Sequence, residues 1–325
     1  MTPLILTLVL GGGMLVLSII APALLRHAAP ALVRVPRLAI IVVGGGIIVW
    51  LASLLALGPV MAWMSTGPVL LPADVAAICQ KCLAAANPFS GTATQAAIPA
   101  ALLLSLPAAI AFALAVGIAR QMYRRSRRSR DAARSLLHSR QHRSLHGYDF
   151  DVIESDRLVA LTFPIRHGGI VLSTATLRTL ERDELIAVLA HESAHIRQRH
   201  HLIAAVVDSI AVYLPWVPLV RAARDALPHY LEIAADNHAR RAAGTTALVA
   251  ALVKLGERED HAPNSAAYTD VLHAAGPDRI RHLVQPAAHA SGAFPAMAIA
   301  TYIVILAIIS VAVQLPYTSA VLTGC

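Results

Sequence analysis

Hydrophobic residues are concentrated in four long blocks of this sequence. The blocks cover about residues 2–25, 38–63, 97–119 and 294–315. Each block approaches or exceeds the roughly 20 apolar residues with which a helix crosses the ~30 Å hydrocarbon core of a bilayer. The first block lacks the basic n-region of a cleavable signal peptide, so we interpret it as a retained span. The pattern predicts an α-helical integral membrane protein with three spans, a polar domain and a fourth span.

The polar region between the third and fourth blocks contains a predicted helix, residues 176–199, which has no glycine or proline and places apolar residues at helical spacing. Within it, the run His-Glu-Ser-Ala-His has the H-E-x-x-H pattern. His191 and His195 project from one face of a helix and can bind one ion. Glu192 can take a proton from a water that the ion polarises and pass it to a leaving amine. The motif predicts one Zn²⁺ per chain and hydrolysis of peptide bonds.

A zinc site of this kind needs a third protein ligand, and Glu232 is the best candidate, 37 residues after His195 on another helix-like stretch. Asp236 lies one turn further along and can hold a ligand imidazole by its second nitrogen. An isolated E-x-x-x-D pattern is usually a solvated helix face, but its place after the first motif favours a ligand. His200 and His201 are not at the position of a third ligand, so we expect them to be exposed or beside a ligand.

A further apolar stretch, residues 202–220, is long enough to suggest a fifth span. A crossing would place Glu232 on the opposite side of the membrane from His191 and His195, unless the next helix returned through lipid with its charged residues. Charged groups at that depth are costly. We therefore expect an interfacial or re-entrant helical hairpin, with a buried core helix of the peptidase as the alternative.

With both motifs in place, the chain resembles the gluzincin membrane peptidases, whose second motif supplies a glutamate ligand and a nearby aspartate. Two groups are similar: the BlaR/MecR-type antirepressor peptidases, and the CAAX-prenyl-protease and heat-shock membrane proteases. The resemblance runs from about Asp156 to Leu283 and includes residues 168–173, which look like the strand and turn before the family's active-site helix. It implies an inserted α+β gluzincin-type zinc peptidase domain.

The resemblance extends to residues 273–283, which are similar to a terminal His-Pro-Pro-x-x-x-Arg-Ile element although both prolines are missing here. It implies that His273 or Arg279 stabilises the oxyanion, a task that needs a donor or cation near the zinc. A basic surface helix is the alternative. Antirepressors that sense β-lactams carry a penicillin-binding domain after their last span. Here no S-x-x-K motif precedes either lysine, so we do not expect direct covalent β-lactam sensing.

Arginines predict the orientation in the membrane. The formal net charge is +8, and residues 120–145 alone hold nine arginines against one aspartate. The loop after the first span has three arginines, whereas the loop 64–96 has only Lys81. Because cytoplasmic loops are the basic ones, both termini are predicted outside the plasma membrane and the peptidase in the cytoplasm. We interpret the basic run as an anchor on anionic lipid, with docking of a repressor or substrate as the alternative, and expect no direct nucleic-acid binding.

All three cysteines, Cys79, Cys82 and Cys325, fall on the predicted outer side, where an oxidising compartment permits a disulfide. Cys79 and Cys82 form a C-x-x-C pair that could be a redox pair, a short-loop bridge or half of a metal site. Three cysteines cannot all pair within one molecule, so their connectivity stays open.

We divide the chain into a membrane domain (1–120) with an outer loop (64–96), a basic juxtamembrane segment (121–145), a cytoplasmic zinc metallopeptidase domain (146–292), and a fourth span with a short outer tail (293–325). The polar residues 142–151 are interpreted as a linker. By resemblance to the antirepressors, we expect a signal-transducing endopeptidase that cleaves itself or a transcriptional repressor after an outside stimulus. A separate sensor partner or a homo-oligomer would fit this role. The alternatives are a quality-control protease and a non-enzymatic membrane adaptor.

Overall fold

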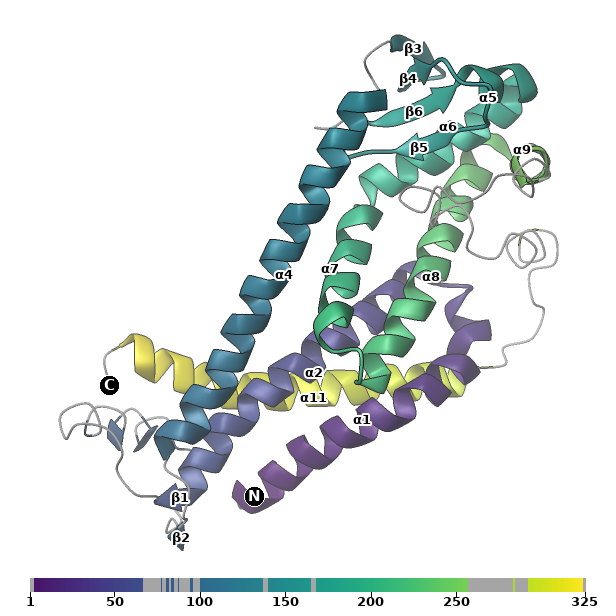
Figure 1. The fold of residues 1–325 in the computed structure, drawn as a ribbon. Coiled ribbons are helices and arrows are strands. Elements are labelled where there is room, and N and C mark those ends of the chain that lie inside the picture. Colours follow the sequence, from purple (N-terminus) through teal and green to yellow (C-terminus); the bar gives the residue numbers. More distant parts are fainter. Residues whose placement is uncertain are drawn as a thin grey trace.

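In this computed structural model we describe residues 3–66, 94–95, 100–136, 140–164, 168–256, 283 and 292–323, together with residues 77, 80, 81, 83, 84 and 87. The three cysteines lie outside the described residues, and so do His273 and Arg279. The described part is mostly helical and contains a small mixed sheet (Figure 1).

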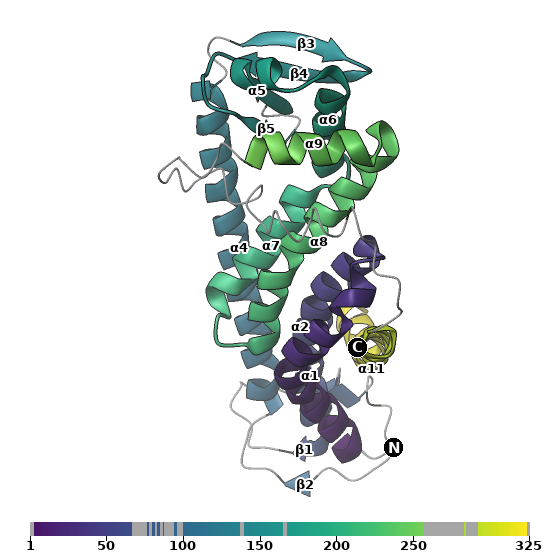
Figure 2. The same ribbon diagram turned by 90° about the vertical axis from the view of Figure 1, so that its right-hand side faces the viewer.

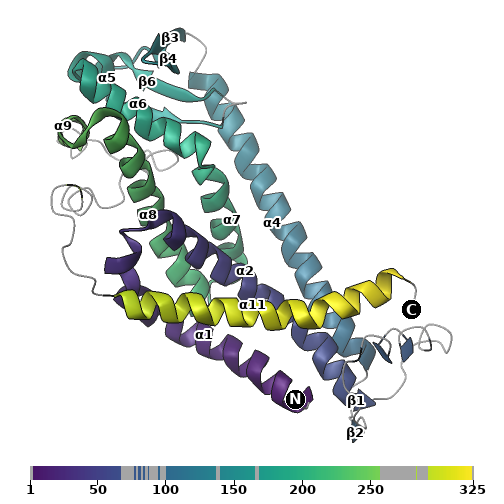
Figure 3. The same cartoon turned by 180° about the vertical axis from the view of Figure 1, so that it is seen from behind.

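Each of the four apolar blocks forms one long helix. These helices are α1 (Pro3–Leu32), α2 (Pro36–Met64), α4 (Ala100–Leu136) and α11 (Ala293–Leu322). All four are long and apolar enough to cross a membrane, so the architecture is that of a multi-pass membrane protein. In the view of Figure 3, α11 runs across α1 and α2.

Helix α4 does not end where its apolar part ends. It continues as one helix past Arg120 to Leu136, so most of the predicted basic segment belongs to the same helix as the third span. Arginine, alanine and leucine are good helix formers, and no glycine or proline interrupts residues 118–136. Figure 1 shows α4 extending from the apolar end of the molecule to the sheet at the other end.

Hydrogen bonds between side chains and backbone join the apolar helices. The Tyr302 hydroxyl of α11 donates to the Gly13 carbonyl of α1 at 2.8 Å. The Ser53 and Ser310 hydroxyls, on α2 and α11, lie 2.8 Å apart and are both buried. Such polar pairs hold helices together where no hydrophobic force distinguishes a helix from lipid.

A close backbone approach between two apolar helices occurs at Gly58, where α2 meets α4. A Cβ atom at Gly58 would lie 2.7 Å from the Leu103 carbonyl oxygen, closer than any such contact allows. At Gly12 of α1, by contrast, an added Cβ would meet nothing within 4 Å. Glycine at position 58 therefore permits the α2–α4 contact.

The four-stranded sheet has the order β3-β4-β6-β5, with β3 (Gln141–Leu145), β4 (Tyr148–Ile153), β5 (Ala160–Thr162) and β6 (Ile170–Ser173). Strands β4 and β6 pair in parallel, and the other two pairs are antiparallel. A separate two-residue pair joins β1 (Ser65–Thr66) to β2 (Thr94–Gln95). Strand β6 confirms the strand expected within residues 168–173.

The interpretation of residues 142–151 as a linker was wrong, because they lie in the β3–β4 hairpin. His146 and Gly147 both have positive φ, as a two-residue hairpin turn requires. Strand β3 is at the edge of the sheet and mostly exposed, so its polar composition concealed it. Phe150 and Val152 of β4 and Ile170 and Leu172 of β6 share one apolar core with side chains of helices α6 (Arg182–Arg197) and α9 (Thr245–Gly256). Figure 2 shows these two helices beside the sheet.

The prediction of a single helix over residues 176–199 was also wrong. The structure has two helices there, α5 (Thr174–Thr179) and α6, separated at Leu180 and Glu181. Glu181 is extended and caps α6 in a capping box with Glu184, whose carboxylate accepts the Glu181 amide at 2.8 Å. A capping box begins a new helix without glycine or proline, so the sequence contains no helix-breaking residue that would predict this boundary.

The apolar stretch after α6 is a helical hairpin. Helix α7 (His200–Tyr213) runs away from α6, and α8 (Pro218–Ala243) returns. Fourteen residues of α7 extend about 21 Å, too short for a crossing. The predicted hairpin is present as a helical hairpin, and it also buries side chains in one core with α1 and α2, as the alternative of a buried core helix expected.

We predict that Gly58→Ala destabilises the protein by about 1–3 kcal/mol, because the new methyl group overlaps a backbone oxygen of α4. Gly12→Ala is the matched control and should be neutral or slightly stabilising, because Ala is the better helix former and the site is open. Thermal unfolding of both variants in the same detergent measures the difference. Equal melting temperatures would contradict the close α2–α4 contact.

The start of α6 gives a pH-dependent prediction. Burial by itself raises the pKa of Glu184, but hydrogen bonds from the Lys254 ammonium, at 2.7 Å, and from the Glu181 amide outweigh burial and hold the pKa below its ordinary value of 4.5. This stabilisation is present above pH 4.5 and is lost as the pH falls through the lowered pKa. We expect Glu184→Gln to cost about 1 kcal/mol at pH 7 and nothing at the acid end.

Thermal unfolding across this pH range measures the effect, with the exposed Glu154→Gln as a control that should be flat. A Glu184→Gln deficit that persists unchanged into acid would mean that packing, rather than charge, is the cause.

Candidate metal centre

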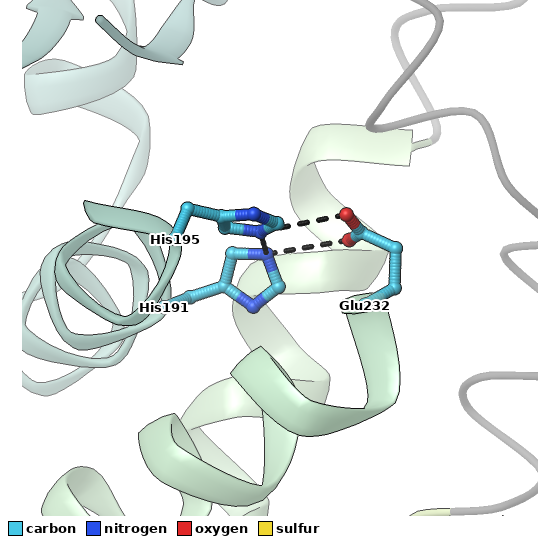
Figure 4. Close-up of side chains that lie close together, drawn as sticks. All are labelled: His191, His195 and Glu232. Carbon is cyan, nitrogen blue, oxygen red and sulfur yellow. Dashed lines mark hydrogen bonds and ion pairs between the residues drawn. The ribbon is translucent and has the colours of Figure 1, made fainter. Parts of the chain in front are cut away.

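Helices α6 and α8 pack against each other and bring three predicted ligands together. His191 and His195 lie one turn apart on α6, and Glu232 faces them from α8 (Figure 4). Their exposed fractions are 6%, 4% and 1%. The two Nε2 atoms are 3.1 Å apart, and each lies 3.4 Å from one oxygen of the Glu232 carboxylate.

This geometry fits a zinc ion. Zinc is bound by imidazole nitrogen and carboxylate oxygen at about 2.0–2.2 Å, and in a tetrahedral arrangement such ligand atoms are about 3.4 Å from one another. The separations of 3.1 and 3.4 Å match that value. One donor atom from each of the three side chains lies within 4.8 Å of the others. The donor set, its spacing and its burial therefore suit one cation.

Asp236 holds the first histidine, as expected from its place one turn beyond Glu232. Its Oδ1 lies 3.0 Å from His191 Nδ1, on the side of the ring away from the carboxylate of Glu232. Burial alone would lower the pKa of His191, but Asp236 and Glu232 outweigh burial and raise the pKa to about 10. Contact through Nδ1 leaves Nε2 directed at the ligand cluster.

His200 contacts the second histidine, His195, as Asp236 contacts His191. It is buried, and its Nδ1 lies 3.1 Å from His195 Nδ1. Burial, together with the positive charge of neighbouring groups, lowers the pKa of His200 to about 4. A neutral imidazole can accept the Nδ1–H of His195, which leaves His195 Nε2 for a metal. Of the two positions that we expected for His200, the structure therefore places it beside a ligand.

The turn between α6 and α7 brings His200 into this position. Arg199 has a left-handed backbone conformation with φ of 54°, which ends α6 and starts α7 in a new direction. His201 is also close, with its ring centroid 6.1 Å from that of His195.

Glu192, the predicted base, is 5% exposed and receives a hydrogen bond from the Thr162 hydroxyl of β5. Sequence analysis missed Thr162. A single threonine 30 residues before Glu192 carries no signal, and only the pairing of β5 with β6 brings it to α6.

We predict that Glu232→Ala abolishes stoichiometric zinc binding, because two imidazoles alone are too few ligands. Asp236→Asn should keep the ligands and weaken zinc affinity by about 10–100-fold, since it removes the charge of the carboxylate that contacts His191 Nδ1. Zinc content of purified protein and competition with a chelator measure both effects. Asp225→Asn, on an exposed face of the same helix, is the matched control. Full zinc content in Glu232→Ala would exclude this ligand set.

Comparison with known proteins agrees with this geometry. The profile of peptidase family M48 matches residues 119–287, slightly more than half of the 325 residues, and this range includes both histidines, Glu192, Glu232 and Asp236. No curated protein and no solved structure matches the chain. Peptidases of this family are zinc-dependent, in keeping with the buried nitrogen and oxygen cluster. The chain belongs to peptidase family M48.

Proposed function

We propose that this protein is an integral-membrane zinc endopeptidase whose catalytic centre faces the cytoplasm close to the membrane. The observation that supports it most directly is the convergence of His191, His195 and Glu232 in a buried cluster within the M48 domain. A binding scaffold would have no need for a glutamate base beside two buried histidines. The attached apolar helices α1, α2, α4 and α11 make it a membrane enzyme.

In the proposed mechanism, His191, His195 and Glu232 hold the zinc, while Asp236 and His200 keep the two imidazoles in the required tautomer. Zinc, when bound, supplies a Lewis acid that polarises the scissile carbonyl and the attacking water. Glu192 takes the proton of that water and delivers it to the leaving amine. The Thr162 hydroxyl donates a hydrogen bond to the Glu192 carboxylate and thereby orients it.

The sheet suggests how a peptide is held. Strand β5 is at the edge of the sheet and carries Thr162 next to Glu192. An extended peptide that pairs with this edge would place its backbone along the base of the site. We therefore propose that substrates bind as extended segments, as an endopeptidase requires.

The arginine distribution supports the proposed orientation. The cluster Arg124–Arg130 lies on the part of α4 that leads to the sheet, and the positive-inside rule assigns that end to the cytoplasm. Both termini are then outside, and the peptidase lies inside the plasma membrane. The same arginines would contact anionic lipid headgroups.

For the biological role, we propose signal transduction: an outside stimulus triggers cleavage of the protein itself or of a transcriptional repressor. This role is supported by a rigid helical connection between the two ends of the molecule. Helix α4 is continuous over 37 residues, about 55 Å, from the outer loop to the first strand of the sheet. It also contacts α7, the helix that follows the metal-binding helix, through Arg125 and Asp208. A displacement at the outer end could thus reach the catalytic side through a rigid element.

We predict that Glu192→Gln keeps one zinc per chain and reduces cleavage by about 10²–10⁴-fold, because only the proton acceptor is removed. Cleavage of the chain itself and of added protein in liposomes measures activity, beside zinc analysis. Glu154→Gln, exposed and outside the site, is the matched control. Wild-type cleavage by Glu192→Gln would require a different base, and no cleavage by any form would favour the adaptor.

The same variant distinguishes the roles. Because Glu192→Gln should bind substrate without cutting it, crosslinking in cells identifies what occupies the site. One repressor-like protein, or the chain itself, is expected for signalling. Many unrelated membrane proteins would instead identify a quality-control protease.

A further inference from the structure

The turn between α7 and α8 exposes an unusual amount of apolar surface. The side chains of Trp216, Val212 and Tyr213 are 72%, 54% and 43% exposed. No charged residue occurs between Asp208 and Arg221. Single exposed apolar residues are ordinary, but a contiguous aromatic and aliphatic group at a hairpin tip indicates a surface that is covered in the working protein.

Helix α4 shows where this tip lies relative to the third span. A Cβ atom at Gly117 would lie 2.7 Å from Cζ of Tyr213, so the tyrosine ring packs on the glycine. Gly117 is three residues before Arg120, the first arginine of the basic run, and lies on the apolar side of it. The tip beyond Tyr213 therefore extends alongside the apolar part of α4.

Charged residues lie where the hairpin contacts the basic part of α4. Asp208 accepts a hydrogen bond from Arg125 of α4 at 3.1 Å and forms an ion pair with Arg224 of α8 at 3.5 Å. This three-residue charge cluster lies five residues from Tyr213 along α7, about 7.5 Å. Where α4 is apolar, the adjacent part of the hairpin is also apolar, and where α4 carries arginines, the adjacent part of the hairpin is charged.

The other side of the hairpin packs on the apolar helices. Val207, Ile210 and Val217 belong to one core with side chains of α1 and α2, while α4 lies on the other side (Figures 1 and 3). The exposed tip is therefore continuous with the surfaces of helices that have the composition of membrane spans.

We propose that α7 and α8 form a re-entrant hairpin whose tip, residues 213–217, is inserted into the hydrocarbon of the leaflet on the peptidase side, with Arg125, Asp208 and Arg224 at headgroup level. Lipid is favoured over a protein partner because the neighbouring apolar helices must face lipid at the same level. Tryptophan and tyrosine beside paired charges are typical of a membrane boundary. Helix α7 enters and α8 leaves on one side, as the contact of Glu232 with both histidines requires.

This insertion determines the height of the catalytic centre above the membrane. Glu232 lies eight residues beyond Arg224 on α8, about 12 Å along the helix. If the proposed function holds, the enzyme cuts bonds about that far from the headgroups. Its substrates are then juxtamembrane segments of membrane-bound proteins.

Depth-dependent quenching of Trp216 fluorescence tests the insertion. Full-length Glu192→Gln protein, which should not cut itself, is placed in liposomes of phosphatidylcholine and phosphatidylglycerol with brominated acyl chains. The Trp216 contribution is the difference between this protein and the same protein with Trp216→Phe, since Trp50 and Trp63 are buried. Acrylamide, a quencher in the aqueous phase, measures how far Trp216 is exposed to water. If the Trp216→Phe protein does not fold, Trp216→Tyr takes its place.

We expect brominated chains to remove roughly half or more of the Trp216 emission and acrylamide to have little effect, since the ring lies below the headgroups. Strong quenching by acrylamide with none by bromine would overturn the proposal. Quenching by neither would also overturn it, because protein, such as a second copy of the chain, would then cover the tip. The quenching measurement needs no catalysis. The insertion can therefore be disproved while the peptidase assignment stands, and the peptidase assignment can be disproved while the insertion stands.

Discussion

The buried carboxylate of Glu232 between two imidazoles is the interaction on which the arrangement depends. A buried carboxylate without a positive partner costs several kcal/mol, so a proton on His191 or a metal cation between the ligands stabilises the α6–α8 contact. The same contact requires α8 to return to the side from which α7 left. Metal chemistry and helix topology are thus consequences of one electrostatic requirement.

The hairpin that satisfies this requirement also joins two cores. The sheet, α6 and α9 form one apolar core, whereas the distal part of α7 and α8 packs in another with α1, α2 and α11. A division of the chain into membrane and peptidase domains by sequence position therefore does not coincide with packing. Glu232, the candidate metal ligand, is carried by a helix that belongs to both parts.

Helix α4 runs along the length of the molecule. Because it continues from an apolar segment into a charged one without a break, it extends from the apolar end of the molecule to the sheet at the other end. Its contacts with α7, at Gly117 and Arg125, lie at two levels of the same hairpin. A rigid helix in contact with the element after the metal-binding helix is a physical route for coupling.

Local patterns in the sequence determined four apolar helices, both metal motifs and the support of His191 by Asp236, because helical spacing and hydropathy are short-range properties. They failed where a long-range contact decides the structure. The break before α6 depends on a capping box braced by Lys254 of α9, and the β3–β4 hairpin depends on pairing at a solvated sheet edge. The roles of His200 and Thr162 arise only when a left-handed turn at Arg199 and an edge strand bring them to α6. Tertiary structure decided these points because their partners are remote in the chain or lie across a turn with no local signature.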